Sequence, residues 1–306
     1  MPADLNGVQD GRREQREKRI RESGVGKRLR FTKMHGLGND FMVVDAIHQE
    51  VRLSPEQIRK LSDRRFGIGF DQLLLVEPPP SAEVDFGYRI FNADGAEVAQ
   101  CGNGARCLAR FVREKGLISR DRIRVATSDR TMVLELVSRD RVKVEMGRPR
   151  FEPEAIPLAF TLPAGEYRLE LGTDRLLHFG AVSLGNPHAV VWTSELDRAP
   201  VVPIGEALNH HPLFPEGVNV GFVEWRSPDQ IRLRVYERGV GETFACGSGA
   251  CAAVAVGIDR GWLARRCRVD LPGGSLEVVW PSSDSPIVLV GPAASVFEGE
   301  IDLEHL

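Results

Sequence analysis

The sequence predicts an α/β (α+β) protein made of two pseudo-symmetric domains that arose by internal duplication. The first observation is a repeat: residues 92–104 and 237–249 carry related segments that end in Cys-Gly-Asn-Gly and Cys-Gly-Ser-Gly. The second is that strand-like runs and one long apolar helix recur in the same order in each half. The third is size, because 306 residues with 42% hydrophobic residues fit two domains of ordinary size. The chain also lacks the GxGxxG motif of a dinucleotide-binding fold.

The first half begins near Leu29. Ser54-Pro-Glu-Gln57 predicts a helix start, with Ser54 as N-cap, Pro55 at the first helical position and Gln57 completing a capping box. A second helix is predicted over 103–115, ended by Gly116, and its apolar face holds Ala105, Leu108, Ala109 and Val112. Strands are predicted at 41–45, 71–76, 88–91, 123–125, 132–136 and 142–146.

The second half repeats this order. Strands are predicted at 189–192, 220–223 and 231–235, and a mostly apolar, hence buried, helix at 249–259. Residues 271–275 predict a turn between two late strands. The proline-rich, charged segment 148–157 marks a crossover, so the boundaries fall at 29–147 and 148–291. Residues 1–28, with eight Lys/Arg and five Asp/Glu, predict a disordered, charged extension.

Charge and composition limit the possible partners. The net charge is −3 and no apolar run approaches the about 20 residues of a membrane span, so neither nucleic acid nor membrane is expected as a partner. The start of the sequence lacks the apolar core of a signal peptide, which makes the cytoplasm the expected location. Five cysteines, an odd number at spacings unlike CxxC, favour neither a disulfide framework nor a metal site.

Cys101 and Cys246 are the repeated cysteines, 145 positions apart, and each lies at a predicted strand-to-helix junction. The first backbone N–H groups of a helix are unpaired and attract anions, and the same field lowers a thiol's pKa. Two such helix ends in one cleft could hold a carboxylate between two acid/base groups, the arrangement that inverts a stereocentre. The other cysteines (Cys107, Cys251 and Cys267) are predicted to be packing residues.

Amide side chains recur as pairs too. A shift of 147 maps Asn39 onto Asn186 and Gln72 onto Asn219, which indicates a polar cleft for ammonium and carboxylate groups. The shift of 145 places Glu237 where the first copy has Asn92, so the bound substrate is expected to be asymmetric. Arg238 could take a second carboxylate in fork geometry. His188 could tune a thiol, although a strand-end histidine bonded to backbone is nearly as good an interpretation.

Together these motifs resemble the diaminopimelate epimerase family. The resemblance runs from about Leu29 to the end and rests on five segments: Met34-His-Gly-Leu-Gly-Asn-Asp-Phe, Asn92-Ala-Asp-Gly, Cys101-Gly-Asn-Gly-Ala-Arg, Gly185-Asn-Pro-His, and Tyr236-Glu-Arg-Gly-Val-Gly-Glu-Thr with Ala-Cys-Gly-Ser-Gly after it. It implies a curved, mainly antiparallel sheet around a long buried helix in each domain. It also implies that residues 292–306 complete the first domain and that the protein is a homodimer.

The resemblance also implies a reaction and a set of residues. The family interconverts LL- and meso-diaminopimelate without pyridoxal phosphate, metal or reducible cofactor, for lysine and, in bacteria, cell-wall precursor synthesis. Cys101 and Cys246 are implied as the acid/base pair, supported by His188 and Glu237. The implied substrate contacts are Asn39, Gln72, Asn92, Asn186, Asn219, Glu237 and Arg238, with Gly102, Asn103, Gly247 and Ser248 as the carboxylate cradle.

Two departures and several alternatives remain. The extension before Leu29 is absent from many members, and Phe297 stands where many have a tyrosine near the dimer contact. A proline or hydroxyproline racemase would also use two cysteines as acid and base. Those enzymes usually have histidine where this chain has Asn103, and they have no evident use for Arg238. A non-catalytic amino-acid-binding protein would not need both cysteines, and a thiol peroxidase or zinc protein is a weaker alternative.

Overall fold

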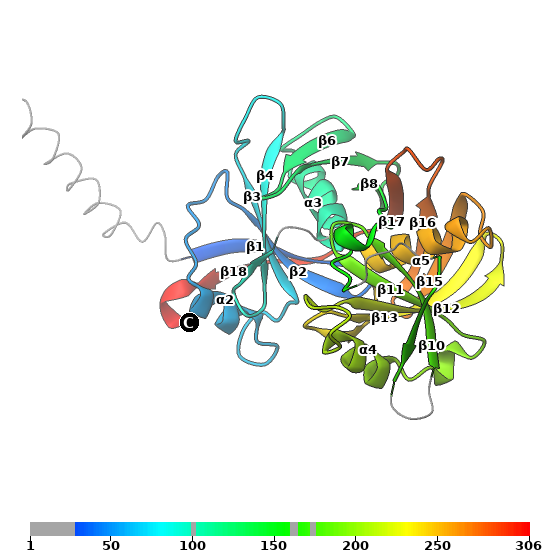
Figure 1. Cartoon of the computed structure of the whole chain (residues 1–306). Coiled ribbons are helices and arrows are strands. Elements are labelled where there is room, and N and C mark those ends of the chain that lie inside the picture. The colour runs from blue at the N-terminus through cyan, green and yellow to red at the C-terminus, as the bar shows by residue number, and fades with distance from the viewer. Residues whose placement is uncertain (1–27, 99–101, 160–164, 172–175) are drawn as a thin grey trace, which may run out of the picture.

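The computed structural model describes residues 28–98, 102–159, 165–171 and 176–306, and the predicted extension lies almost entirely outside them. Figure 1 shows two lobes, each with strands wrapped around one long helix. The first lobe contains β1 (Arg28–Gly36), β2 (Asn39–Asp45), α2 (Pro55–Ser62), β3 (Gln72–Glu77), β4 (Phe86–Asn92), β5 (Glu97–Val98), α3 (Gly102–Glu114), β6 (Arg122–Ala126), β7 (Thr131–Leu136) and β8 (Arg141–Gly147).

The second lobe repeats the order of the first. Its matching elements are β10 (Leu176–Ser183), β11 (Pro187–Trp192), α4 (Val201–Asn209), β12 (Asn219–Ser227), β13 (Gln230–Glu237), β14 (Gly241–Thr243), α5 (Gly247–Asp259), β15 (Arg266–Leu271), β16 (Gly274–Val279) and β17 (Ile287–Pro292). β9 (Tyr167–Glu170) follows the first copy and pairs with β10, just as β18 (Ala294–Asp302) follows the second copy and pairs with β1. Three 3₁₀ turns (Pro153–Ala155, Leu196–Arg198 and Leu303–His305) lie outside the repeated order.

The pairing of strands repeats as well. β2 runs parallel to β3, with Phe41 opposite Gln72, and β11 runs parallel to β12, with His188 opposite Asn219. The other pairs within each repeat are antiparallel except β4–β6 and β13–β15. Parallel neighbours begin at the same edge of a sheet, so each half gathers the start of two strands beside its helix N-terminus. The duplication predicted from the sequence is therefore present in the fold.

The halves share strands and a core. β8 pairs with β17. The last strand, β18, returns to pair antiparallel with β1, and the first residue pair of this register is Arg28 opposite Asp302. One hydrophobic cluster contains side chains of both α3 and α5, while two smaller clusters lie under α4 and α2. These contacts fix the N-termini of α3 and α5 relative to each other.

The local predictions about the helices are confirmed. Ser54 and Gln57 form both hydrogen bonds of the capping box at the start of α2. The predicted apolar face of α3 is fully buried, and Gly116 has the positive φ of a helix-ending glycine. In α5 ten of thirteen residues are buried, so this helix has no extended polar face. The segment Pro272-Gly273 makes the predicted turn between β15 and β16.

Candidate active site

Cys246 caps the N-terminus of α5. Its backbone is extended, with φ −123° and ψ 111°, and its carbonyl accepts the first helical hydrogen bond, from the N–H of Ala250 at 3.0 Å. The thiol is buried, and its Sγ lies 3.6 Å from the hydroxyl of Ser248. Gly249 leaves room for it, because a Cβ there would lie 3.3 Å from the sulfur. The strand-to-helix junction predicted for this cysteine is confirmed.

The predicted fall in the thiol pKa is wrong for Cys246. Burial raises its pKa well above the usual value, and the nearby charge of Glu237 adds to the rise. Hydrogen bonds involving Ser248 and the backbone of Gly249 act in the opposite direction and are outweighed. A helix N-terminus supplies about half a positive charge, which does not replace the water lost by a buried thiolate. This cysteine is therefore favoured in its protonated form.

Glu237 lies beside this thiol at the end of β13. Burial raises the pKa of its carboxyl, and the negative charge of Asp71 contributes in the same direction. Hydrogen bonds from Thr243, at 2.6 Å, and with Cys246 limit the rise. The carboxyl and the thiol thus form a partly desolvated acid pair in the second lobe.

Cys101, the other predicted catalytic residue, lies outside the described residues. The description resumes at Gly102, the first residue of α3, followed by the buried side chain of Asn103. The Nδ2 of Asn103 donates to Asn39 Oδ1 at 3.1 Å and to the carbonyl of Ala245 at 2.9 Å. The second contact joins the N-terminus of α3 to the residue before Cys246. The two predicted helix junctions therefore meet.

The second lobe holds its matching amide in a related way. Asn186 Nδ2 donates to the hydroxyl of Ser248 at 3.4 Å, so the helix-start residue again contacts the asparagine of the preceding hairpin. Asn186 Oδ1 lies 3.1 Å from His188 Nε2. Because the amide oxygen can only accept, Nε2 carries the hydrogen. Burial, with a contribution from the charge of Arg238, lowers the pKa of His188 to about 3, so the imidazole is neutral.

The remaining predicted contacts divide between the lobes. Gln72 Nε2 donates to Asn92 Oδ1 at 2.8 Å, which leaves the buried Gln72 Oε1 without a partner among the described residues. Asn219 donates to the Pro187 carbonyl at 3.1 Å and accepts from the backbone N–H of Arg238 at 3.0 Å. Gln72 and Asn219 lie at the starts of β3 and β12, where the parallel strand pairs bring them beside the helix ends.

Arg238, the residue predicted to take a second carboxylate, lies at the surface. Its side chain is exposed, and one of its N–H groups donates to the carbonyl of Glu216 at 2.8 Å. An exposed guanidinium keeps its hydration, so leaving it without a carboxylate costs little free energy. Its nearness to His188 still lets its charge act inside the second lobe.

The repeated glutamates have a structural role. Glu97 accepts two hydrogen bonds from Arg89, at 2.9 and 2.8 Å, and Glu242 accepts two from Arg234, at 2.7 and 3.0 Å. Each pair joins the strand before the cysteine to the short strand that leads to it. The spacing of four residues from Glu97 to Cys101 and from Glu242 to Cys246 therefore repeats along with the hairpin.

Sequence reasoning missed three polar residues of this region. Asp71 accepts a hydrogen bond from Asn39, and Thr243 donates one to Glu237. Arg106 is fully buried in α3, where it donates to the carbonyls of Pro292 and, at 3.4 Å, Gly102. The Ala-Arg after Cys101-Gly-Asn-Gly was a signal for the last, since arginine is seldom fully buried without a specific site.

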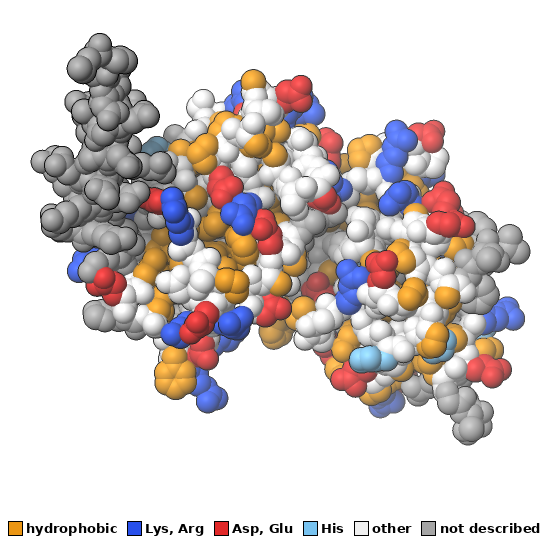
Figure 2. All heavy atoms as spheres, turned by 60° about the vertical axis from the view of Figure 1, so that its left-hand side comes forward, with side chains coloured by type: hydrophobic (Ala, Val, Ile, Leu, Met, Phe, Trp, Pro, Cys, Tyr) orange, Lys and Arg blue, Asp and Glu red, His pale blue; other side chains and the backbone are white. Residues whose placement is uncertain are grey.

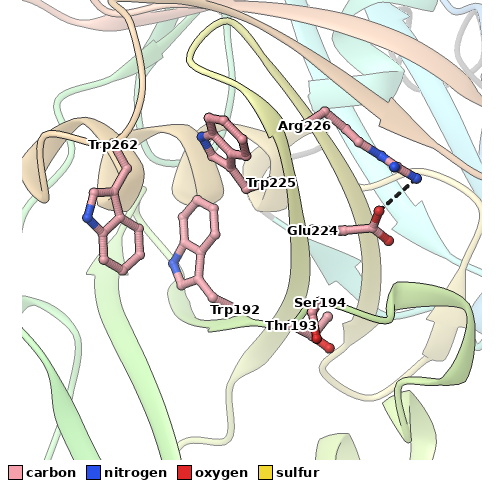
Figure 3. Close-up of a pocket in the computed structure, with 7 residues that line it drawn as sticks. All are labelled: Trp192, Thr193, Ser194, Glu224, Trp225, Arg226 and Trp262. Atoms are coloured by element: carbon pink, nitrogen blue, oxygen red, sulfur yellow. Dashed lines mark ion pairs between the residues drawn. The ribbon is translucent and has the colours of Figure 1, made fainter.

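A cavity of about 880 Å³ lies elsewhere, beside three tryptophans (Figure 3). It is lined by Trp192, Thr193, Ser194, Glu224, Trp225, Arg226 and Trp262. Trp192 ends β11, four residues after His188, so the cavity is about 13 Å along this strand from the candidate site. On the face drawn in Figure 2, Lys/Arg and Asp/Glu side chains are interspersed over both lobes, without a broad basic surface. Among the described residues no helix is long and apolar enough to cross a membrane.

The fold, the two helix starts and a family match over both halves of the chain define an enzyme of the epimerase and isomerase class. The diaminopimelate epimerase family model matches residues 31–152 and 180–296, and the chain belongs to that family. A hydroxyproline epimerase from Agrobacterium vitis superposes with a TM-score of 0.66 at 15% identity, over 90% of this chain and 92% of that one.

Two further structures share the fold. A PhzF-family phenazine biosynthesis protein from Bacillus anthracis superposes with a TM-score of 0.62 at 16% identity, covering 90% of this chain and 99% of its own. A predicted epimerase from Pseudomonas aeruginosa gives a TM-score of 0.63 at 16% identity, over 89% and 99%. At these identities the likeness extends to the fold alone.

Proposed function

We propose that this protein interconverts LL- and meso-diaminopimelate by proton transfer at the α-carbon, in lysine and cell-wall precursor synthesis in the cytoplasm. The observation that carries the proposal is the meeting of two Cys-Gly-polar-Gly helix starts, joined by the hydrogen bond from Asn103 to Ala245. The family match over both halves of the chain supports the same reaction.

The two cysteines have opposite roles in this scheme. Cys101 is the thiolate in the free enzyme, and Cys246, whose burial raises its pKa, is the thiol. For one direction the Cys101 thiolate takes the α-proton from one face while Cys246 gives its proton to the other face. The charges then stand reversed, with Cys101 a thiol and Cys246 a thiolate, ready for the other direction. No step requires a cofactor.

The helix starts supply the electrostatics. Backbone N–H groups of Gly102, Asn103, Gly247 and Ser248 hold the α-carboxylate, which stabilises the charge that develops as the C–H bond breaks. Gln72 Oε1, which has no hydrogen-bond partner in the described part of the chain, and the carboxyl of Glu237 accept hydrogen bonds from the α-ammonium. Asn39, Asn92, Asn186 and Asn219 contact the rest of the substrate, and Arg238 takes its distal carboxylate.

A proline or hydroxyproline racemase is the main alternative, since a hydroxyproline epimerase shares the fold. Asn103, where those enzymes usually have histidine, favours diaminopimelate over proline. Arg238, whose exposed guanidinium donates to the backbone carbonyl of Glu216, favours a substrate with a second carboxylate. The test is incorporation of solvent deuterium at the α-carbon, followed by NMR, with LL-diaminopimelate and L-proline as parallel substrates. Exchange into proline alone, or into neither, contradicts the proposal.

We further propose a homodimer formed through β18. This strand pairs with β1 on one side, and Phe297 on it is 49% exposed while its ring meets Phe31 edge-on at 5.9 Å. A long strand with exposed apolar residues invites pairing with a second copy. Sedimentation of the wild type and of Phe297→Glu tests this. The wild type is expected to be a dimer and the variant a monomer, and a wild type that sediments as a monomer contradicts the proposal.

A further inference from the structure

Asp71 lies just before β3, at the centre of a hydrogen-bonded group in the first lobe. Its Oδ2 accepts from Asn39 Nδ2 at 2.8 Å and from the backbone N–H of Asp40 at 3.1 Å. Its Oδ1 accepts from Arg64 at 2.8 Å. None of the substrate contacts implied by the family resemblance includes this aspartate.

The contact with Asp71 determines which way the Asn39 amide faces. A carboxylate only accepts hydrogen bonds, so the NH₂ group of Asn39 must point to Asp71 and its oxygen must point away. That oxygen receives the Nδ2 of Asn103 at 3.1 Å. Asn103 Nδ2 is shared with the Ala245 carbonyl, so Asn103 Oδ1 faces Gly247, where a Cβ would lie 3.4 Å from it.

This chain of contacts links a charged surface group to both helix starts. Arg64 is fixed by two further hydrogen bonds to Asp40, at 2.9 and 2.8 Å, and Lys33 binds the same carboxylate at 2.6 Å. Burial alone would raise the pKa of Asp40, but the hydrogen bonds and charges of Arg64 and Lys33 outweigh it and hold the pKa at about 2. Asp71 is thus attached to an ionised, rigid group.

The second lobe has no equivalent of Asp71. The shift of 147 that maps Asn39 onto Asn186 maps Asp71 onto Val218, which is buried. Asn186 is held by His188 and Ser248 instead. The aspartate therefore belongs to what distinguishes the two lobes and not to the duplicated framework.

We propose that Asp71 is a positioning residue that acts through Asn39, setting the amide orientation of Asn39 and Asn103 at the junction of the two helix starts. This inference rests on the proposed epimerase function. It assigns Asp71 no contact with the substrate. Misplacing an orienting group by about 1 Å lowers rates by up to about 100-fold, so loss of Asp71 is expected to reduce kcat more than it raises KM.

A double-mutant cycle between Asp71 and Asn39 tests this mode of action. Asp71→Ala is expected to lower kcat/KM by about 10- to 100-fold, and Asp71→Asn, which keeps an oxygen for Asn39, by less. In the Asn39→Ala background the Asp71→Ala change is expected to add almost nothing. The matched control is Asp197→Asn, which removes a charge from the exposed ion pair with Arg232 and leaves turnover unchanged. Additive losses in the cycle, or full activity in Asp71→Ala, overturn the proposal.

A second measurement does not depend on turnover. With ¹⁵N-asparagine labelling, the side-chain amide signals of Asn39 are identified by their loss in Asn39→Ala. They are expected to move in Asp71→Ala and to stay in place in Asp197→Asn, and unmoved signals in Asp71→Ala overturn the proposal. If the wild type fails to exchange diaminopimelate while these signals move, the proposed function falls and the link from Asp71 to Asn39 stands.

Discussion

Replacing Cys246 with alanine should remove almost all epimerisation while the protein stays folded. The change deletes one buried sulfur whose polar neighbours are the Ser248 hydroxyl, at 3.6 Å, and the Glu237 carboxyl. Loss of a general acid lowers rates by about 10²- to 10⁴-fold. Loss of one buried heavy atom costs about 1 kcal/mol of unfolding free energy, a melting shift of a few degrees for a chain of this size.

Cys251→Ala is the matched control. Cys251 lies in the same helix, is fully buried, and has its pKa raised by burial to about 12, so the change removes the same atom from an inert thiol. Its expected stability loss equals that of Cys246→Ala or exceeds it slightly. Its expected kcat/KM is that of the wild type.

The assay is α-deuterium incorporation into LL- and meso-diaminopimelate in D₂O, with thermal melts of both variants. Exchange without inversion in Cys246→Ala would fit the scheme, because Cys101 can still remove and return a proton on its own face. Inversion within about tenfold of the wild-type rate would refute the two-base reasoning. Equal loss of activity in Cys251→Ala would show that packing, not the thiol, is what the first variant disturbed.

Three further outcomes follow. His188 has a pKa of about 3 in the folded protein against 6.5 in the unfolded chain, so between these values only the unfolded chain binds the proton. At pH 5 this lowers the free energy of unfolding by roughly 2 kcal/mol, a loss that urea melts of His188→Gln should not show. Identical pH dependence of stability in the two proteins would contradict this. Gly205→Ala puts a Cβ 2.2 Å from the Tyr236 ring and should destabilise by about 1–3 kcal/mol, outweighing the helix preference of alanine; a higher melting temperature would show that α4 moves freely. Arg238→Gln should raise KM for diaminopimelate about tenfold or more, with little change in melting temperature, and an unchanged KM would remove Arg238 from the site.

The repeat made much of the fold predictable. The junction at Cys246, the capping box at Ser54 and the buried helix α5 depend on local sequence, so they could be read directly. Helix α4 (Val201–Asn209) was not predicted, because Pro203 and Gly205 are poor helix formers. It forms because the glycine allows close packing on Tyr236, a tertiary contact that the local sequence does not report.

The site was predicted less completely, and the reasons are physical. The helix-end argument for a low thiol pKa considered one local effect, but burial of Cys246 by the surrounding fold raises the pKa instead. Asp71 was missed because the site prediction relied on residues repeated in both halves, and the position equivalent to Asp71 in the second half is Val218. Cys101, half of the predicted catalytic pair, lies outside the described residues, so its role stays a prediction.

The duplication conserves a framework and varies what the framework carries. The pairs Arg89–Glu97 and Arg234–Glu242 hold equivalent hairpins with nearly equal distances. Around them the orienting groups differ: an ionised cluster behind Asp71 fixes the amide in the first lobe, and a neutral His188 fixes it in the second. An enzyme that inverts one of two stereocentres in its substrate needs equal placement of its two acid/base groups around the reacting end and separate recognition of the distal end. A duplicated scaffold with divergent polar partners provides both, because the strand pairings set the placement while single side chains change the recognition.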